Sequence, residues 1–167
     1  LGVSKAICSC SKASRTSSKV FVVVMTFNFN NTSVTTLSVT DNEKDLNNTS
    51  IVLKVKYKNT SFLFTGDMES KIESQILTQN IKSDVLKIGH HGSRYSTSQA
   101  FLEKVSPTYA VISVGKNNIY NHPNEETLER LQAKNIKVYR TDQNGTIIAS
   151  SNGTIITFST INTDTNG

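Results

Sequence analysis

The chain has 167 residues, of which 36% are hydrophobic, which is enough for one globular domain with its own core. Lys and Arg exceed Asp and Glu by five, and this mild basic excess is weak support for an anionic partner such as nucleic acid. The apolar run VFVVVMTF at 20–27 is far shorter than the roughly 20 residues that cross a bilayer. No small-residue cleavage site follows it, so we expect neither a membrane segment nor a signal peptide in this chain.

The start of the chain carries few structural signals. Residues 1–19 are rich in Ser and Lys and have no apolar periodicity, so we expect a poorly ordered lead-in. The two cysteines, Cys8 and Cys10, are too close for an unstrained disulfide, and a zinc knuckle would need further ligands at other spacings. We divide the chain into an unassigned lead-in at 1–32, a folded domain at 33–161 and a tail at 162–167.

Short β-type runs come first and alternate later with helical patterns. The expected strands before residue 66 lie at 20–27, 33–39, 50–57 and 61–65, with a hairpin turn in YKNTSF between the last two. Further strands are expected at 84–88, 109–114 and 137–140, helices at 68–82, 96–105 and 124–134, and a terminal hairpin at 145–158 turning at Asn152-Gly153. Strand, helix, strand, helix and strand after residue 60 predict a layered α/β domain.

Three polar motifs follow predicted strands. In FLFTGDMES, Asp67 comes directly after an apolar strand and a glycine. A carboxylate at that place can bridge two cations with its two oxygens, although Asp is also a favoured N-cap for the helix expected at 68–82. Both interpretations stay open on the residues alone.

The second motif, LKIGHHGS, places His90 and His91 in a turn after the next strand. Neutral imidazole is a common ligand of zinc and similar metals. Adjacent histidines usually cannot both bind one ion, so we expect one ligand and one neighbour that either supports the ligands from behind or contacts the substrate. The alternative is a solvent-exposed pair in a loop.

The third motif, NNIYNHP, brings His122 to the start of a predicted helix, with Asn118 and Tyr120 as possible donors to an anion. An ordinary helix-entry loop is the alternative. Because loops after the strands of a layered α/β sheet converge on one edge, the three motifs together favour metal-assisted hydrolysis.

These residues resemble the C-terminal half of a metallo-β-lactamase-fold hydrolase, and within that superfamily the ComEC-type DNA-internalisation competence proteins and their free-standing secreted relatives. The resemblance covers about residues 33–160. It rests on TGD, GHHGS and N-x-Y-x-H-P in this order, within NNTSIVL, FLFTGDMESKIE, DVLKIGHHGSRYSTS, SPTYAVISVGKNNIYNHPNEETLERL and KVYRTDQNGTI. It implies an αββα sandwich of two similar halves, of which this chain supplies the second.

The resemblance also implies roles for individual residues. Asp67 matches the carboxylate that bridges two divalent metal ions, zinc or manganese, and His90 matches the late histidine ligand, with His91 as the alternative. The remaining matches are to catalytic or substrate-side loops that contact phosphate or protonate a leaving group: Ser93, Asn118, Tyr120 and His122. The implied reaction is phosphodiester hydrolysis, and the implied substrate is the DNA strand that is not taken up.

One departure from the family pattern limits this interpretation. The first half of the family's domain carries His-x-His-x-Asp-His, whereas this chain has no histidine before His90. We therefore expect a fragment of a metal-dependent hydrolase, with the missing half as its partner. The alternative is a truncated, non-catalytic module that binds DNA or a partner without turnover. The resemblance implies an extracytoplasmic or membrane-associated parent protein.

Overall fold

The computed structural model describes residues 7–8, 25–38 and 45–161. Apart from Ile7–Cys8, the lead-in predicted at 1–19 lies outside the described residues, as do Cys10 and the tail at 162–167. The first five residues of the strand predicted at 20–27 lie outside them too.

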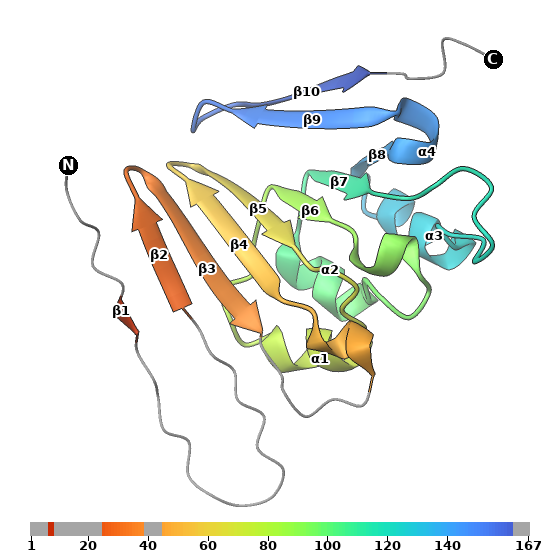
Figure 1. Ribbon diagram of the computed structural model, residues 1–167, viewed down its shortest axis with the longest axis horizontal. Helices are drawn as coiled ribbons and strands as arrows, with labels where there is room; N and C mark the ends of the chain where they lie inside the picture. Colours follow the sequence, from red (N-terminus) through yellow and green to blue (C-terminus); the bar gives the residue numbers. More distant parts are fainter. Residues whose placement is uncertain (1–6, 9–24, 39–44, 162–167) are drawn as a thin grey trace, which may run out of the picture.

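Within the described residues, eight strands form one mixed sheet in which their spatial order follows their order along the chain (Figure 1). Neighbours from β1 to β5 are antiparallel, and neighbours from β5 to β8 are parallel. Parallel neighbours need a crossover connection, and the helical segments of the sequence lie in those connections. The strands are β1 (Ile7–Cys8), β2 (Met25–Phe29), β3 (Thr32–Ser38), β4 (Val52–Tyr57), β5 (Thr60–Phe64), β6 (Val85–Lys87), β7 (Tyr109–Ile112) and β8 (Lys137–Arg140).

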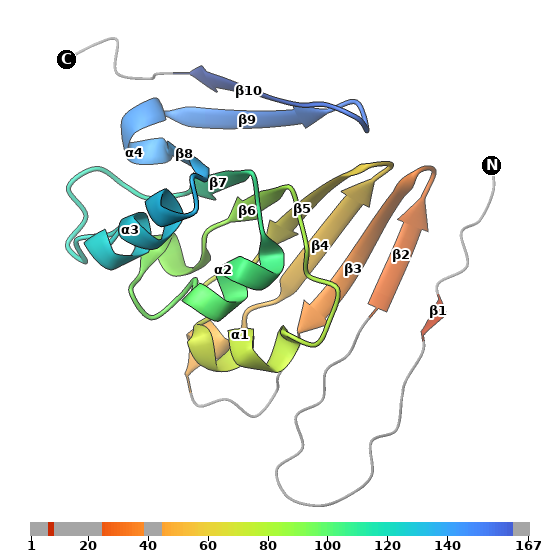
Figure 2. The same cartoon turned by 180° about the vertical axis from the view of Figure 1, so that it is seen from behind.

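Three helices cover one face of this sheet, as Figure 2 shows from behind: α1 (Ser70–Ile76), α2 (Gln99–Val105) and α3 (Glu125–Ala133). The core lies between these helices and the strands, because alternate strand residues point to one face. Shorter helices are η1 (Leu46–Thr49), η2 (Gly89–Gly92) and α4 (Thr141–Asn144). The fully buried core side chains include Leu63, Leu86, Ala110 and Ile112 from strands and Ile72, Ile76, Phe101, Leu102 and Leu131 from helices.

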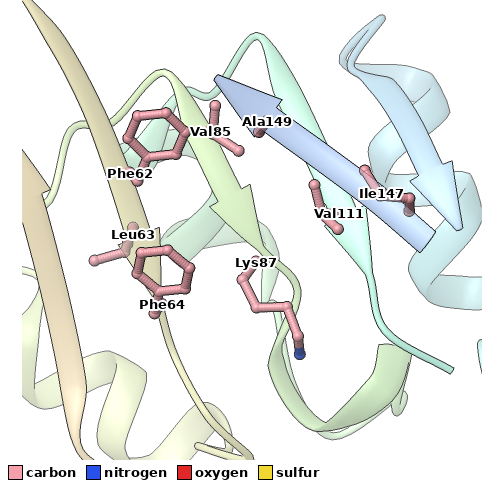
Figure 3. Close-up of a pocket in the computed structure, with 8 residues that line it drawn as sticks. All are labelled: Phe62, Leu63, Phe64, Val85, Lys87, Val111, Ile147 and Ala149. Carbon is pink, nitrogen blue, oxygen red and sulfur yellow. The ribbon is translucent and has the colours of Figure 1, made fainter. Parts of the chain in front are cut away.

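The opposite face of the sheet is covered in part by a hairpin of β9 (Thr146–Ser151) and β10 (Ile156–Ile161). The Phe158 ring lies 4.3 Å from the Tyr139 ring and 4.8 Å from the Tyr109 ring, which holds the hairpin against β7 and β8. Between β9 and β5–β7 lies a largely apolar pocket of about 250 Å³ (Figure 3). Its lining residues are Phe62, Leu63, Phe64, Val85, Lys87, Val111, Ile147 and Ala149.

Most predicted elements are present, and the main difference, at the end of α1, has a clear cause. The helix predicted at 68–82 ends at Ile76, because the Gln79 amide donates to the Leu37 carbonyl on β3 and Lys54 donates to the Asn80 carbonyl. These contacts draw the chain toward the sheet, while Ile81 still enters the core. The short helix α4 was not predicted.

The α/β class is confirmed, and the αββα sandwich stays a prediction. Within the part of the chain that the structure describes, no helix has the length and apolar character needed to cross a membrane.

Candidate active site

The three polar motifs meet at one edge of the sheet. β5, β6 and β7 are parallel neighbours, so their carboxyl ends lie together, and Asp67, His90 and the loop before His122 follow these ends in turn. The backbone joins the first two motifs directly, since the His90 N–H donates to the Gly66 carbonyl at 3.1 Å. The predicted convergence is therefore present in the fold.

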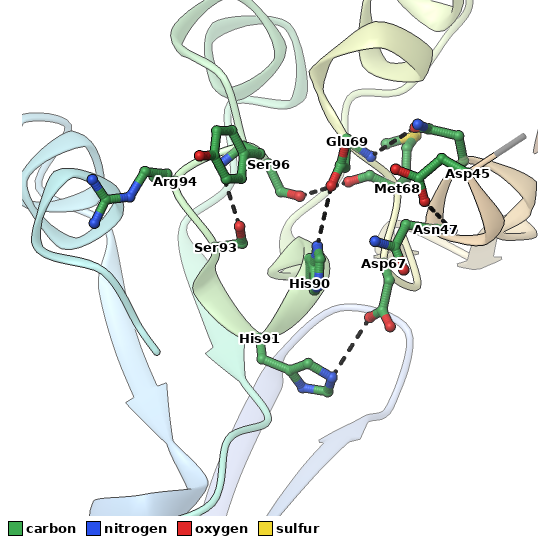
Figure 4. Close-up of polar contacts among 12 residues, drawn as sticks. Asp45, Asn47, Asp67, Met68, Glu69, His90, His91, Ser93, Arg94 and Ser96 are labelled. Atoms are coloured by element: carbon green, nitrogen blue, oxygen red, sulfur yellow. Dashed lines mark hydrogen bonds and ion pairs between the residues drawn. The ribbon is translucent and has the colours of Figure 1, made fainter. Parts of the chain in front are cut away.

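Asp67 is held by a tight turn and its carboxylate is left available. Gly66 has φ +55°, and a side chain there would also meet Ser50 at 2.9 Å. The Asp67 N–H donates to the Ser50 hydroxyl at 3.0 Å. The N-cap of α1 is Glu69, so the structure contradicts the interpretation of Asp67 as the cap. Figure 4 shows the Asp67 carboxylate turned toward His91.

His91 is oriented by two contacts on opposite sides of its ring. Its Nδ1 lies 2.7 Å from the Ser113 carbonyl, and its Nε2 lies 3.7 Å from Asp67 Oδ1. A carbonyl can only accept, so Nδ1 carries the proton of this hydrogen bond. A neutral imidazole in this tautomer has its Nε2 lone pair on the side of the Asp67 carboxylate. This arrangement of a backbone carbonyl behind the ring is common among metal-binding histidines.

His90 faces other groups than its neighbour. Its Nδ1 is 3.6 Å from Glu69 Oε1, and this buried nitrogen makes no hydrogen bond to any described residue (Figure 4). Its ring lies edge-on to the His122 ring, with 5.6 Å between the centroids. The His90 and His91 rings are 6.3 Å apart. The two adjacent histidines thus divide between two surroundings.

The loop before α3 brings His122 to the cluster. Burial lowers the pKa of His122, and repulsion from His90 and His91 lowers it further. The Asn118 amide donates to the carbonyls of Gly115 and His122 and accepts from the His122 N–H, so it shapes this loop from within. Tyr120 is 70% exposed, and its ring stacks on His122 with centroids 5.8 Å apart.

Ser93 lies beneath this surface rather than on it. It is 2% exposed, its N–H donates to the His90 carbonyl at 2.9 Å, and its hydroxyl accepts from the Tyr95 N–H. Its contacts close the η2 turn. A direct contact with a bound molecule would require this turn to move.

Asn124, which the sequence analysis did not single out, ties the two histidine loops together. Its N–H donates to the Gly92 carbonyl, its side-chain oxygen accepts from the Arg94 N–H, and its side-chain nitrogen donates to the Asn121 carbonyl. Gly92 has φ +87°, and a Cβ there would lie 2.5 Å from Pro123. The spacing between the His91 and His122 loops therefore depends on backbone packing.

Glu69 and Ser113 are the other groups that the sequence analysis missed. Glu69 stands two residues after Asp67, just past the Gly66–Asp67 turn, and a second carboxylate so near a candidate ligand is a usable signal. Ser113 contacts His91 through its main-chain carbonyl. Every residue has such a carbonyl, so the residue type at 113 could not predict this contact.

The donor set fits a metal ion in part. Asp67 and His91 offer a carboxylate oxygen and an imidazole nitrogen to one point, in the combination that zinc and manganese accept. Among the described residues, no group of three or more His, Cys, Asp and Glu side chains is placed to hold an ion. A tight site would need ligands from elsewhere.

The sequence of the chain was compared with those of known proteins. No family model matches the chain. It is 46% identical over 115 residues to ComE operon protein 3 of Bacillus subtilis (strain 168), which covers 68% of the chain and 15% of that protein. The chain is homologous to competence proteins.

Two further relatives agree with this result. Competence protein ComA of Neisseria gonorrhoeae is 43% identical over 106 residues, covering 62% of the chain and 15% of the relative. Recombination protein 2 of Haemophilus influenzae is 40% identical over 102 residues, covering 60% of the chain and 13% of the relative. The chain thus spans about 15% of the length of these curated relatives, and its resemblance to competence proteins is confirmed.

Proposed function

We propose that the chain is part of a metal-dependent phosphodiesterase or nuclease that acts on DNA in competence-type DNA uptake. The observation that carries the proposal is the convergence of Asp67, His91, His90 and His122 at the carboxyl ends of β5–β7. The homology to competence proteins supports DNA as the substrate.

We assign the metal-binding role to Asp67 and His91. Of the two adjacent histidines, His91 has the Nε2 that faces Asp67 and the Nδ1 that is fixed by a carbonyl. When bound, zinc or manganese would screen the charge of a phosphodiester and lower the pKa of water. The remaining ligands would come from a His-x-His-x-Asp-His half, which we propose as the partner of this chain.

His90 and His122 are then the groups on the substrate side. Their rings meet edge-on beside the Asp67–His91 pair, so either can donate to a phosphate oxygen or hold the proton of a leaving group. The Glu69 carboxylate faces the His90 Nδ1 at 3.6 Å on the side away from Asp67. Tyr120 stands exposed at the rim and would contact the substrate next to the reacting phosphate, while Asn118 and Ser93 keep the two loops in shape.

The second candidate is a non-catalytic module that binds DNA without turnover. The observation that favours it is the two-ligand donor set, since the described residues hold no group of three. Both candidates share the same fold and the same surface. They differ in whether the phosphodiester bond is broken.

The deciding experiment measures hydrolysis of a fluorescently labelled oligonucleotide with Mn²⁺ or Zn²⁺. It compares this chain with a longer protein that joins it to a His-x-His-x-Asp-His half. We expect hydrolysis by the longer protein, lost in Asp67→Ala and His91→Ala and kept in Glu129→Ala, an exposed carboxylate on α3. DNA binding without hydrolysis by both proteins would favour the module, and undiminished hydrolysis by Asp67→Ala would refute the site.

A further inference from the structure

A second polar site shares no residue with the histidine cluster. A groove of about 430 Å³ opens over β3 and β4, next to the end of α1. The helix-side face of the sheet changes there from apolar to polar. Its lining residues are Ser33, Thr35, Leu37, Lys54, Lys56, Gln79 and Asn80.

The groove presents two ammonium groups on one face of β4. Lys54 and Lys56 are two residues apart, so their side chains point the same way. Lys54 is fixed by hydrogen bonds to the backbone and side-chain oxygens of Asn80, at 2.9 and 3.2 Å, and Lys56 is exposed. No acidic residue occurs among the described residues that line the groove.

The electrostatic environment of these lysines favours an anion. Burial lowers the pKa of Lys54, and the charge of Lys56 lowers it further, against an opposing contribution from Asp84. The Asp84 carboxylate already accepts from the N–H and hydroxyl of Ser61. An anion between the two lysines would relieve their repulsion.

Each lysine also has a hydroxyl beside it on the neighbouring strand. In the register of the antiparallel pair, Lys54 is opposite Thr35 and Lys56 is opposite Ser33. The same cation–hydroxyl pair is therefore repeated at a distance of two residues, roughly 7 Å along the strands. This repeat is comparable to the spacing of successive phosphates in an extended nucleic-acid strand.

Gln79 adds a side-chain amide to the lining of the groove. Its Oε1 is buried and has no hydrogen-bond partner among the described residues, while its Nε2 donates to the Leu37 carbonyl. A nucleobase N–H group could satisfy this oxygen if the Gln79 side chain turned toward the groove, because the oxygen is closed to solvent. The groove thus offers two cation–hydroxyl pairs, with the Gln79 amide in its lining.

We propose that this groove binds the sugar-phosphate backbone of a nucleic-acid strand, with one phosphate at Lys54 and Thr35 and the next at Lys56 and Ser33. The site is separate from the proposed hydrolytic site and needs no turnover. It would give the chain a second point of contact with DNA, on the helix-side face of the sheet.

The test measures binding of a fluorescein-labelled oligothymidylate 20-mer to the 167-residue chain by fluorescence anisotropy, in EDTA and at several KCl concentrations. The groove variant is K54Q/K56Q. The matched control is K104Q/K137Q, which removes two exposed lysines outside the groove. K56Q alone keeps the Lys54–Asn80 contacts and therefore tests the site without disturbing the end of α1.

Counterion release on single strands changes the salt slope by about 0.7 per phosphate contact, so K54Q/K56Q should make the slope less steep by about 1.4, and K56Q by about half of that. K54R/K56R should keep the slope, as should the control. An uncharged methylphosphonate 20-mer should bind wild type and groove variant alike. Equal losses in groove and control variants, no loss in K56Q, or wild-type binding to phosphatidylglycerol vesicles in place of the oligonucleotide would each overturn the proposal. Hydrolysis does not enter this readout, so its outcome is independent of the test of the histidine site.

Discussion

Two consecutive residues at the site, His90 and His91, adopt the left-handed backbone conformation, with φ of 47° and 55°. This conformation is unfavourable for residues other than glycine, and it costs of order 1–3 kcal/mol for each such residue. Hydrogen bonds from the His90 N–H to the Gly66 carbonyl and from the Ser93 N–H to the His90 carbonyl hold the turn. As a result, neighbouring rings point to different carboxylates, and the two histidines can serve different purposes.

The division between these histidines is testable by metal titration of the chain. We expect His91→Ala to weaken Mn²⁺ or Zn²⁺ binding about 10-fold or more, as Asp67→Ala would. Each substitution removes one of the two side chains that would bind the ion and leaves only the other. His90→Ala should change the affinity little, since the His90 Nδ1 faces Glu69. Isothermal titration calorimetry measures both. Equal losses in the two histidine variants would contradict the assignment.

At the scale of elements, α1 fixes the loop that leads from η2 to α2. The Glu73 side chain is 1% exposed, and its carboxylate accepts from the N–H groups of Thr97 and Ser98, at the start of α2. The Ser96 hydroxyl donates to the Met68 carbonyl at 2.8 Å. Because the same loop continues back to the histidines, the packing of α1 against α2 positions the site.

Glu73 should make the stability of the fold depend on pH. Burial raises the pKa of Glu73 above its ordinary value of 4.5, although hydrogen bonds from Ser98 and Thr97 and the charge of Arg130 oppose this. The folded state therefore binds the proton more tightly than the unfolded state. The contribution of the protonated Glu73 to the stability of the folded state is fully present below pH 4.5. It is lost as the pH rises through the pKa that Glu73 has in the folded state.

We expect the stability of the wild type relative to Glu73→Gln to fall as the pH rises above 4.5. The glutamine cannot titrate, and its single oxygen leaves one backbone N–H unpaired, which costs about 1–3 kcal/mol. Urea unfolding followed by circular dichroism at a series of pH values measures the difference. Two stability curves that remain parallel over this range would argue against the raised pKa.

At the scale of the whole molecule, the sheet is covered unequally on its two faces. The helices bury one face, whereas the β9–β10 hairpin covers only part of the other and leaves Phe64 44% exposed beside the pocket of Figure 3. Contiguous apolar surface of this kind favours association. The half-domain that we propose as a partner would bury this exposed face of the sheet.

The exposed face predicts a concentration-dependent association of the isolated chain. Phe64→Ser should lower the mean mass in multi-angle light scattering, because it removes an apolar group from the uncovered face. Ile155→Ser, at a side chain that is 60% exposed in the hairpin turn, is the control and should leave the mass unchanged. An unchanged mass in Phe64→Ser would indicate that this face does not drive association.

The sequence by itself determined the local elements and the edge at which the polar motifs meet. Alternation in β4 and β5, helical spacing in α2 and α3, and Asn152-Gly153 in the hairpin turn are patterns of neighbours along the chain. The parallel order of β5–β7 followed from the helices between them, and with it the convergence of Asp67, His90 and His122.

The tertiary structure alone decided which groups pair at that edge. The contacts of His91 with Asp67 and Ser113, of His90 with Glu69, and the end of α1 at Ile76 depend on atoms separated by about 20 to 40 residues. The Asn118 amide, which looked available to an anion, is used by the carbonyls of its own loop. Such distances are set by packing and backbone hydrogen bonds across the fold, which no local pattern of residues encodes.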